Sequence, residues 1–211
     1  MPLFSCLYVG PQHEDPIQQV STIDAIINGT YGQIDGISIS VSDTEIITPA
    51  ISRAVNANIP VITFDSDAQN SLRKAYIGTD NYSFGMELGK LLHQLAPRGG
   101  TYGIIGGSAP NIQDRVQGVR DRLADTKWIE VTTSYKDSLD STSVSLELMY
   151  EYSKEDVDAI IPVGGWPMFG EDTQPWKDFV DANRNMTLIV ADTLPQQIEL
   201  MNQGYVNGLV G

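Results

Sequence analysis

The chain has 211 residues, a length that suits one large domain or two small lobes, and its 41% hydrophobic content supports a folded core. The formal net charge is −14, from 27 acidic and 13 basic residues. This charge argues against nucleic acid and against an anionic membrane surface as partners, because both are bound by clustered Lys and Arg.

The first third of the chain alternates strand-like and helix-like segments. Short β-branched runs predict strands, and Ile and Val at helical spacing predict the helices between them. The run at 61–64 has no room for a polar face, so we expect a strand buried on both sides of a parallel sheet. Cys6 lies in an apolar run and is expected to be buried. The expected order is strand 3–9, helix 16–27, strand 36–41, helix 45–55, strand 61–64 and strand 75–77.

After Asn81 the alternation starts again, which predicts a second α/β unit. The expected helices are 83–95, 111–123, 141–152, 171–183 and 195–203, and the expected strands are 102–105, 129–134, 159–163, 188–191 and 206–210. The pattern favours two lobes with parallel sheets, a first lobe at 1–79 and a second at 80–211, joined by a hinge at 78–81.

Motifs for cofactors, metals and hydrolytic catalysis are missing from the sequence. The glycines at 103, 106 and 107 have the wrong spacing for a dinucleotide fingerprint, and no P-loop follows them. Cys6 is the only cysteine, and there are two histidines, His13 and His93, far apart in the sequence. We therefore expect no cofactor, no metal site and no catalytic triad.

Polar and aromatic residues follow one predicted strand after another. Each alone is also typical of a turn or a helix cap. Together, at the same end of parallel strands, they resemble a sugar pocket, which needs carboxylates and amides for hydroxyl groups, an Arg as a fixed donor and an aromatic face. The residues are Asp43, Asp65, Asn111 to Arg115, Asp137, Asp140, Trp166 and Asp192.

Three stretches together resemble one protein family. They are Asn58-Ile-Pro-Val-Ile-Thr-Phe-Asp-Ser-Asp67, Tyr76-Ile-Gly-Thr-Asp-Asn81 and Arg115-Val-Gln-Gly118. In this order they are similar to the ribose-binding-protein family of type I periplasmic sugar-binding proteins, which is related to the effector domains of lactose-repressor-type regulators. The resemblance covers essentially the whole chain and implies two flavodoxin-like lobes that close on a small ligand.

The resemblance also implies ligand-binding residues. Asp65 matches the family's ligand-binding Asp after its Ile-Pro-Val-Ile-Thr strand, and Asn81 matches the Asp-Asn hinge motif. Arg115 matches the Arg that grips hydroxyls, and Asp192 matches the Asp after the penultimate strand of the second lobe. Ser66 stands where ribose binders often carry Arg, so the resemblance implies a ligand other than ribose.

Two departures from the family carry expectations of their own. The sequence Gly164-Gly165-Trp166 replaces the family's Asn, which implies aromatic stacking and a different sugar or polyol. Asp137, which follows the predicted strand 129–134, is the remaining residue of the expected ligand set. The family has a strand and a helix before the segment equivalent to 3–9, and its chain crosses back to the first lobe beyond the position of Gly211. We therefore expect a shortened first lobe and a homodimer formed through it.

The function expected from this resemblance is that of a solute-binding protein for a sugar or polyol, without enzymatic activity. Its partner would be an ABC permease or a receptor, and its location periplasmic or extracellular, although no signal peptide is visible. The alternative is a ligand-sensing domain of a transcription regulator or a membrane receptor kinase. A third class, an α/β enzyme such as a phosphatase or deacylase, lacks a nucleophile–base pair in the sequence.

Overall fold

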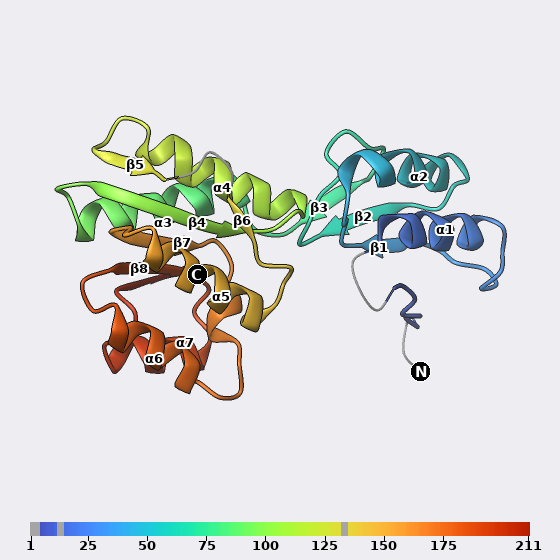
Figure 1. The fold of residues 1–211 in the computed structure, drawn as a ribbon. Helices are drawn as coiled ribbons and strands as arrows, with labels where there is room; N and C mark the ends of the chain where they lie inside the picture. Colours follow the sequence, from blue (N-terminus) through green and yellow to red (C-terminus); the bar gives the residue numbers. More distant parts are fainter. Residues whose placement is uncertain (1–4, 12–14, 132–134) are drawn as a thin grey trace. The chain divides into compact units, whose positions relative to one another are not determined.

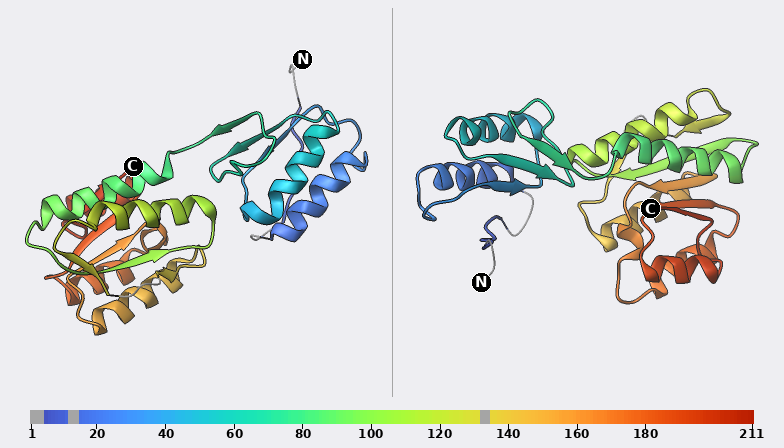
Figure 2. Two further views of the ribbon diagram at one scale, coloured as in Figure 1. Left: turned by 90° about the horizontal axis from the view of Figure 1, so that it is seen from above. Right: turned by 180° about the vertical axis from the view of Figure 1, so that it is seen from behind.

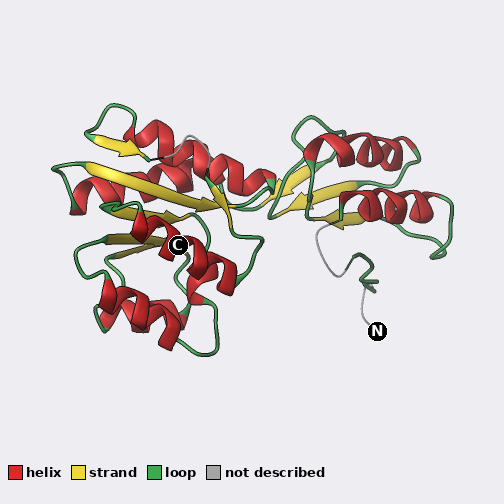
Figure 3. Cartoon of the chain, viewed as in Figure 1, coloured by secondary structure: helices red, strands yellow, loops and turns green. Residues whose placement is uncertain are grey.

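A computed structural model of the chain describes residues 5–11, 15–131 and 135–211. The chain forms two compact units, Met1–Thr79 and Asp80–Gly211 (Figure 1). Each unit has its own parallel sheet with helices beside it, as the colouring by secondary structure in Figure 3 makes plain. The predicted α/β fold with parallel sheets is confirmed.

The first unit is a three-stranded parallel sheet in the order β1-β2-β3, with two helices. Its helices begin where the sequence places good caps: the carboxylates of Asp15 and Asp43 accept hydrogen bonds from the backbone N–H groups of Gln18 and Ile46. The elements are α1 (Pro16–Ile27), β1 (Ile37–Ile39), α2 (Thr44–Asn56), β2 (Val61–Phe64) and β3 (Ala75–Ile77).

The core of the first unit lies on one face of its sheet. Helices α1 and α2 lie side by side there (Figure 2), and Ile47 and Ile51 pack with Val61 of β2. On the other face Phe64 is 43% exposed, next to its register partner Ile77, which is also exposed. The prediction that β2 is buried on both faces is therefore wrong, because α1 and α2, the helices described in the first unit, cover the same face.

The predicted strand at 3–9 is also wrong for the residues that the structure describes. Residues 5–9 form no strand, and positions 3 and 4 lie outside the described residues. Tyr8 is 94% exposed, and Cys6 is exposed rather than buried. The physical reason is that a β-prone run becomes a strand only when a neighbouring strand supplies its hydrogen bonds, and no sheet strand pairs with this segment among the described residues.

The second unit is a six-stranded parallel sheet in the order β5-β4-β7-β8-β9, with β6 also paired to β4. Helices and strands lie close to the predicted positions; the strand predicted at 129–134 is shorter, and 132–134 lie outside the described residues. The elements are α3 (Asn81–Leu95), β4 (Gly100–Gly106), α4 (Pro110–Leu123), β5 (Trp128–Glu130), β6 (Lys136–Asp137), α5 (Thr142–Lys154), β7 (Ala159–Pro162), the 3₁₀ helix η1 (Trp166–Met168), α6 (Gln174–Ala182), β8 (Thr187–Ala191), α7 (Pro195–Asn202) and β9 (Gly208–Val210).

Both faces of this second sheet are covered, which gives three layers. Ile104 and Ile161 pack against α3 and α4, while Ile105 and Ile160, one residue along each strand, pack against α5 and α6. Continuous apolar runs such as β7 are typical of strands covered on both faces. Two short elements, β6 and η1, were not predicted, because each has too few residues to show a period.

Helices α3 and α4 pack at backbone contact because glycines face each other. A Cβ atom on Gly118 of α4 would lie 2.9 Å from the backbone nitrogen of Met86, and one on Gly85 of α3 would collide with the carbonyl of Arg115. Only Gly fits at such an approach. Gly85 follows Asn81 by four residues and Gly118 follows Arg115 by three, so this contact also sets the distance between those two side chains.

Replacement of Gly118 by Ala should therefore lower the free energy of unfolding of the second unit by about 1–3 kcal/mol, the usual cost of overpacking. Chemical denaturation followed by tryptophan fluorescence measures this loss, since the chain's three Trp residues all lie in that unit. Gly107→Ala is the control, because its Cβ would meet no atom closer than 3.5 Å. Equal stability of the two variants would refute the packing argument.

Candidate functional site

In the first unit the candidate residue Asp65 directly follows β2 in a left-handed conformation, with φ at +57°. Its backbone N–H donates to the carbonyl of Ile77 at 3.2 Å, and its carboxylate accepts a hydrogen bond from the hydroxyl of Ser40 at 3.1 Å. Residues other than Gly adopt this conformation at a cost, and strained backbone of this kind often marks functional sites. The exposed carboxylate thus stands at the carboxyl end of the strand with a defined orientation.

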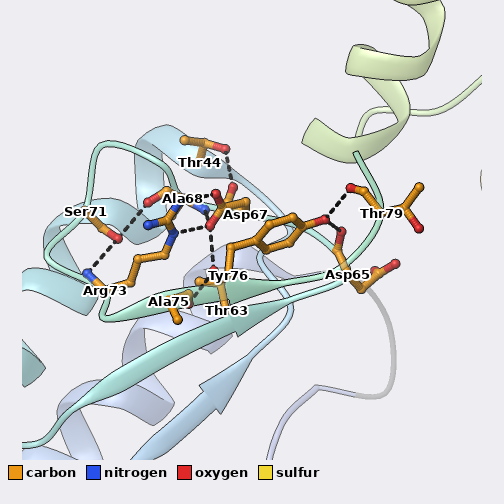
Figure 4. Close-up of polar contacts among 10 residues, drawn as sticks. All are labelled: Thr44, Thr63, Asp65, Asp67, Ala68, Ser71, Arg73, Ala75, Tyr76 and Thr79. Atoms are coloured by element: carbon orange, nitrogen blue, oxygen red, sulfur yellow. Dashed lines mark hydrogen bonds and ion pairs between the residues drawn. The ribbon is translucent and has the colours of Figure 1, made fainter. Parts of the chain in front are cut away.

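The next two residues, Ser66 and Asp67, turn back into the first unit. Ser66 is 2% exposed, and its carbonyl accepts a hydrogen bond from the backbone N–H of Val41. Asp67 forms an ion pair with Arg73 and accepts a hydrogen bond from the hydroxyl of Thr63 (Figure 4). This ion pair could not be predicted from the sequence, because Arg73 stands six residues after Asp67, beyond a turn.

The pKa of Asp67 lies below its ordinary value of 3.8. Partial burial acts to raise it, but the hydrogen bonds from Arg73 and Thr63, the charge of Arg73 and the N–H of Ala68 together outweigh burial. Asp67 therefore stays ionised as a fixed part of the loop between β2 and β3.

In the second unit the side chain of Arg115, on α4, is held by the first turn of α3 and by the residue that follows β7. Asp80 caps α3 through the N–H of Ser83, which places Asn81 in the first turn of the helix. The side-chain carbonyl of Asn81 accepts a hydrogen bond from Arg115 Nε at 2.8 Å, and Arg115 Nη1 donates to the carbonyl of Val163 at 2.9 Å. The guanidinium also lies over the ring of Phe84, 4.4 Å from its centroid.

Asp192 stands after β8 as Asp65 stands after β2, in the same left-handed conformation. It directly follows the strand with φ at +73°, and its N–H donates to the carbonyl of Val210 at 2.7 Å. Its carboxylate accepts a hydrogen bond from the backbone N–H of Gly165 at 3.0 Å. Since Val163 and Gly165 both follow β7, the second unit brings Arg115 and Asp192 to the same strand end.

The predicted aromatic residue, Trp166, packs into the core of the second unit and is 8% exposed. Its ring lies against Gly164, whose Cβ would come within 2.6 Å of it. Sequence reasoning missed Phe169, which is 43% exposed. A Cβ on Gly165 would lie 2.6 Å from Cζ of Phe169 and 2.8 Å from Asp192 Oδ2, so this ring and this carboxylate flank one glycine.

The last predicted residue, Asp137, ends β6 beside the end of β4. Its carboxylate accepts a hydrogen bond from the N–H of Leu139 at 2.8 Å and lies 3.9 Å from the Cβ position of Gly107. It therefore stands at the carboxyl edge of the second sheet, where ligands of open α/β sheets bind.

The chemistry of these groups suits neutral ligands rich in hydroxyl groups. Asp65 and Asp192 offer acceptors, Arg115 offers donors, and a hydroxyl group can satisfy both kinds. Within residues 5–11, 15–131 and 135–211, no group of three or more His, Cys, Asp and Glu side chains could hold a metal ion. In the same residues no helix combines the length and the apolar composition that a bilayer crossing requires.

Comparison with solved structures defines the class of protein. The fold is that of type I periplasmic sugar-binding proteins. An ABC transporter solute binding protein from Burkholderia graminis in complex with D-arabinose is 23% identical, with a TM-score of 0.81 over 95% of this chain and 70% of that one. A chain of the XylFII–LytSN complex is 21% identical, with a TM-score of 0.78 over 93% and 71%. At these identities the likeness shows the fold alone.

A glucose-galactose binding protein from Geobacillus stearothermophilus is 27% identical, with a TM-score of 0.78 over 94% of this chain and 70% of that one. The family model of the periplasmic binding protein domain matches residues 4–211. The chain therefore belongs to the periplasmic binding protein domain family, as its sequence motifs predicted.

The lowered pKa of Asp67 predicts a pH-dependent contribution to the stability of the first unit. A carboxylate with a depressed folded-state pKa stabilises the fold fully above its unfolded pKa, and the contribution is lost as the pH falls through the folded pKa. Asp67→Asn should therefore cost about 1–2 kcal/mol near pH 7, and this cost should shrink once the pH is lowered below about 3.8.

Urea denaturation of the 211-residue chain at a series of pH values measures this cost. Asp24→Asn is the matched control in the same unit, because its ion pair with Arg53 is exposed on both sides and should contribute little. A cost of Asp67→Asn that stays constant down to about pH 2 would contradict the assignment.

Proposed function

We propose that this protein is a solute-binding protein that binds a sugar or sugar-like polyol for an ABC importer. The observation that carries the proposal is the gathering of Arg115 and Asp192 at the end of β7, each tied to backbone there by a hydrogen bond of 2.9–3.0 Å. Family membership and the 27% identical glucose-galactose binding protein support the same ligand class.

The proposed ligand residues come from both units. Asp65 is the proposed carboxylate of the first unit, and Asn81, Arg115 and Asp192 are the proposed polar groups of the second. Ser66 and Asp137 are proposed to lie at the edge of the site. Ser66 is included because it directly follows Asp65, and Asp137 because it stands at the carboxyl edge of the second sheet.

Phe169 is proposed to cover the apolar face of the sugar ring. Its ring is exposed and shares Gly165 with the Asp192 carboxylate, so a polyol that bonds Asp192 lies within reach of an aromatic face. Trp166 is proposed to support this wall from the core beneath it.

The proposed partner is an ABC permease, and the proposed location is periplasmic or extracellular. The exposed pair of Phe64 and Ile77 on the first unit is consistent with a homodimer through that unit, which stays a prediction. Sedimentation of the purified chain at micromolar concentration measures it.

Calorimetric titration with D-glucose, D-galactose, D-arabinose and D-allose tests the ligand class. Asp65→Asn and Asp192→Asn should each weaken binding of the best of these sugars roughly tenfold to a hundredfold, because a charged hydrogen bond shielded from water is worth about 1.5–3 kcal/mol. Asn is the substitution of choice since it tolerates the left-handed backbone at both positions.

Asp156→Asn is the matched control, because Asp156 has the same left-handed backbone, with φ at +56°, but is exposed at the end of a helix. Its affinity should equal that of the unmodified chain. Absence of binding for every sugar up to millimolar concentration, or equal affinities for all three variants, would reject the proposed function.

Phe169→Ala should weaken sugar binding roughly tenfold or more without lowering the thermal midpoint, since covering a Phe ring is worth about 1.5–3 kcal/mol. Ile129→Ala, which removes another exposed apolar side chain of the same unit, is the control and should leave affinity unchanged. Unchanged affinity of Phe169→Ala would show that the ring lies away from the ligand.

A further inference from the structure

The phenol of Tyr76 ties two backbone positions of the first unit together. Its hydroxyl lies 2.8 Å from the carbonyl oxygen of Asp65 and 3.0 Å from that of Thr79 (Figure 4). A phenol has one proton to donate, so the two carbonyls share it. Asp65 is the candidate ligand residue, and Thr79 is the last residue before the second unit begins.

The position of this phenol is fixed by the strand before it and by the glycine after it. Tyr76 pairs in register with Thr63 in the middle of β3, which sets the direction of its side chain. The ring then lies over Gly78, where a Cβ atom would come within 2.5 Å of the phenol carbon Cζ. Because Gly78 has no Cβ atom, there is room for the Tyr76 ring between β3 and Thr79.

The contacts that hold Asp65 in its left-handed conformation include its N–H with Ile77, its carboxylate with Ser40 and its carbonyl with Tyr76. That conformation costs an Asp about 1 kcal/mol or more relative to an ordinary turn. The Tyr76 hydroxyl also contacts Thr79, in the segment that leads into the second unit.

We propose that Tyr76 is a positioning residue for sugar binding. Its hydroxyl sets the direction of the Asp65 carboxylate and couples that direction to the backbone at Thr79, so that a change where the units join is transmitted to Asp65. This inference rests on the proposed function, because it assigns Asp65 to the ligand.

Tyr76→Phe removes the hydroxyl and keeps the ring over Gly78, which makes it the test variant. Tyr82→Phe is the matched control, since it also deletes a tyrosine hydroxyl; that hydroxyl donates to Asp121 at 3.0 Å in the second unit. In calorimetric titration with D-glucose, D-galactose, D-arabinose and D-allose, Tyr76→Phe should weaken the best sugar about fivefold to tenfold, and Tyr82→Phe should not.

A double-mutant cycle separates positioning from a purely structural effect. In the Asp65→Asn background the Tyr76→Phe substitution should cost less than about twofold, because the carboxylate that Tyr76 positions is already gone. An equal loss of affinity in both backgrounds would mean that Tyr76 acts independently of Asp65, and the proposal would fall.

Hydrogen exchange without ligand gives a second readout. In Tyr76→Phe, exchange should accelerate in peptides covering 64–67 and 77–80 and stay unchanged in peptides covering 47–55 of α2. If the unmodified chain binds none of the sugars but this local acceleration appears, the proposed function fails while the tie between Asp65 and Thr79 stands. Unchanged exchange at 64–67, or acceleration throughout the first unit, overturns the positioning role.

Discussion

The constraint on which the rest of the structure depends is the left-handed turn that directly follows β2 in one unit and β8 in the other. At each turn an Asp leaves the sheet at once, so its carboxylate stays at the carboxyl end of the strand. The conformation costs an L-residue about 1 kcal/mol or more, and neighbouring strands offset this cost through Ile77 for Asp65 and Val210 for Asp192. Because those acceptors belong to β3 and β9, each candidate carboxylate is positioned only when the strand next to it has paired.

The sequence predicted the strands and helices well where local chemistry decides them, as at the Asp43 cap and the run Val61–Phe64. It failed where the outcome depends on a partner. The run at 3–9 has the composition of a strand, but its described residues have no hydrogen-bonded neighbour. Phe64 has the composition of a core residue, but both helices of its unit lie on the opposite face. Composition shows that a segment can form a strand or pack in a core. It does not show whether the neighbouring strand or helix that this requires is there.

The candidate site likewise has features that the sequence could predict and features that it could not. Polar residues at strand ends could be found from the sequence, because parallel strands end at one edge. The bond between Arg115 and Asn81 could not, since it follows from the close contact of α3 and α4 at their glycines. Nor could the sequence separate Asp65 from Asp67: both follow the same strand, but Arg73 binds the second into the loop and leaves the first exposed.

The net charge of −14 disfavours an anionic ligand, but it has no bearing on a neutral polyol, the ligand class proposed above. Long-range attraction raises the rate at which charged ligands arrive, but it does not act on a neutral polyol. Such a ligand can be selected only by short hydrogen bonds whose directions match its hydroxyl groups and by a covered apolar face. For the proposed ligand, affinity then depends on how rigidly each carboxylate is held. The backbone N–H groups of Asp65 and Asp192 are both fixed by hydrogen bonds to a neighbouring strand, and the Asp192 carboxylate accepts a further one from Gly165.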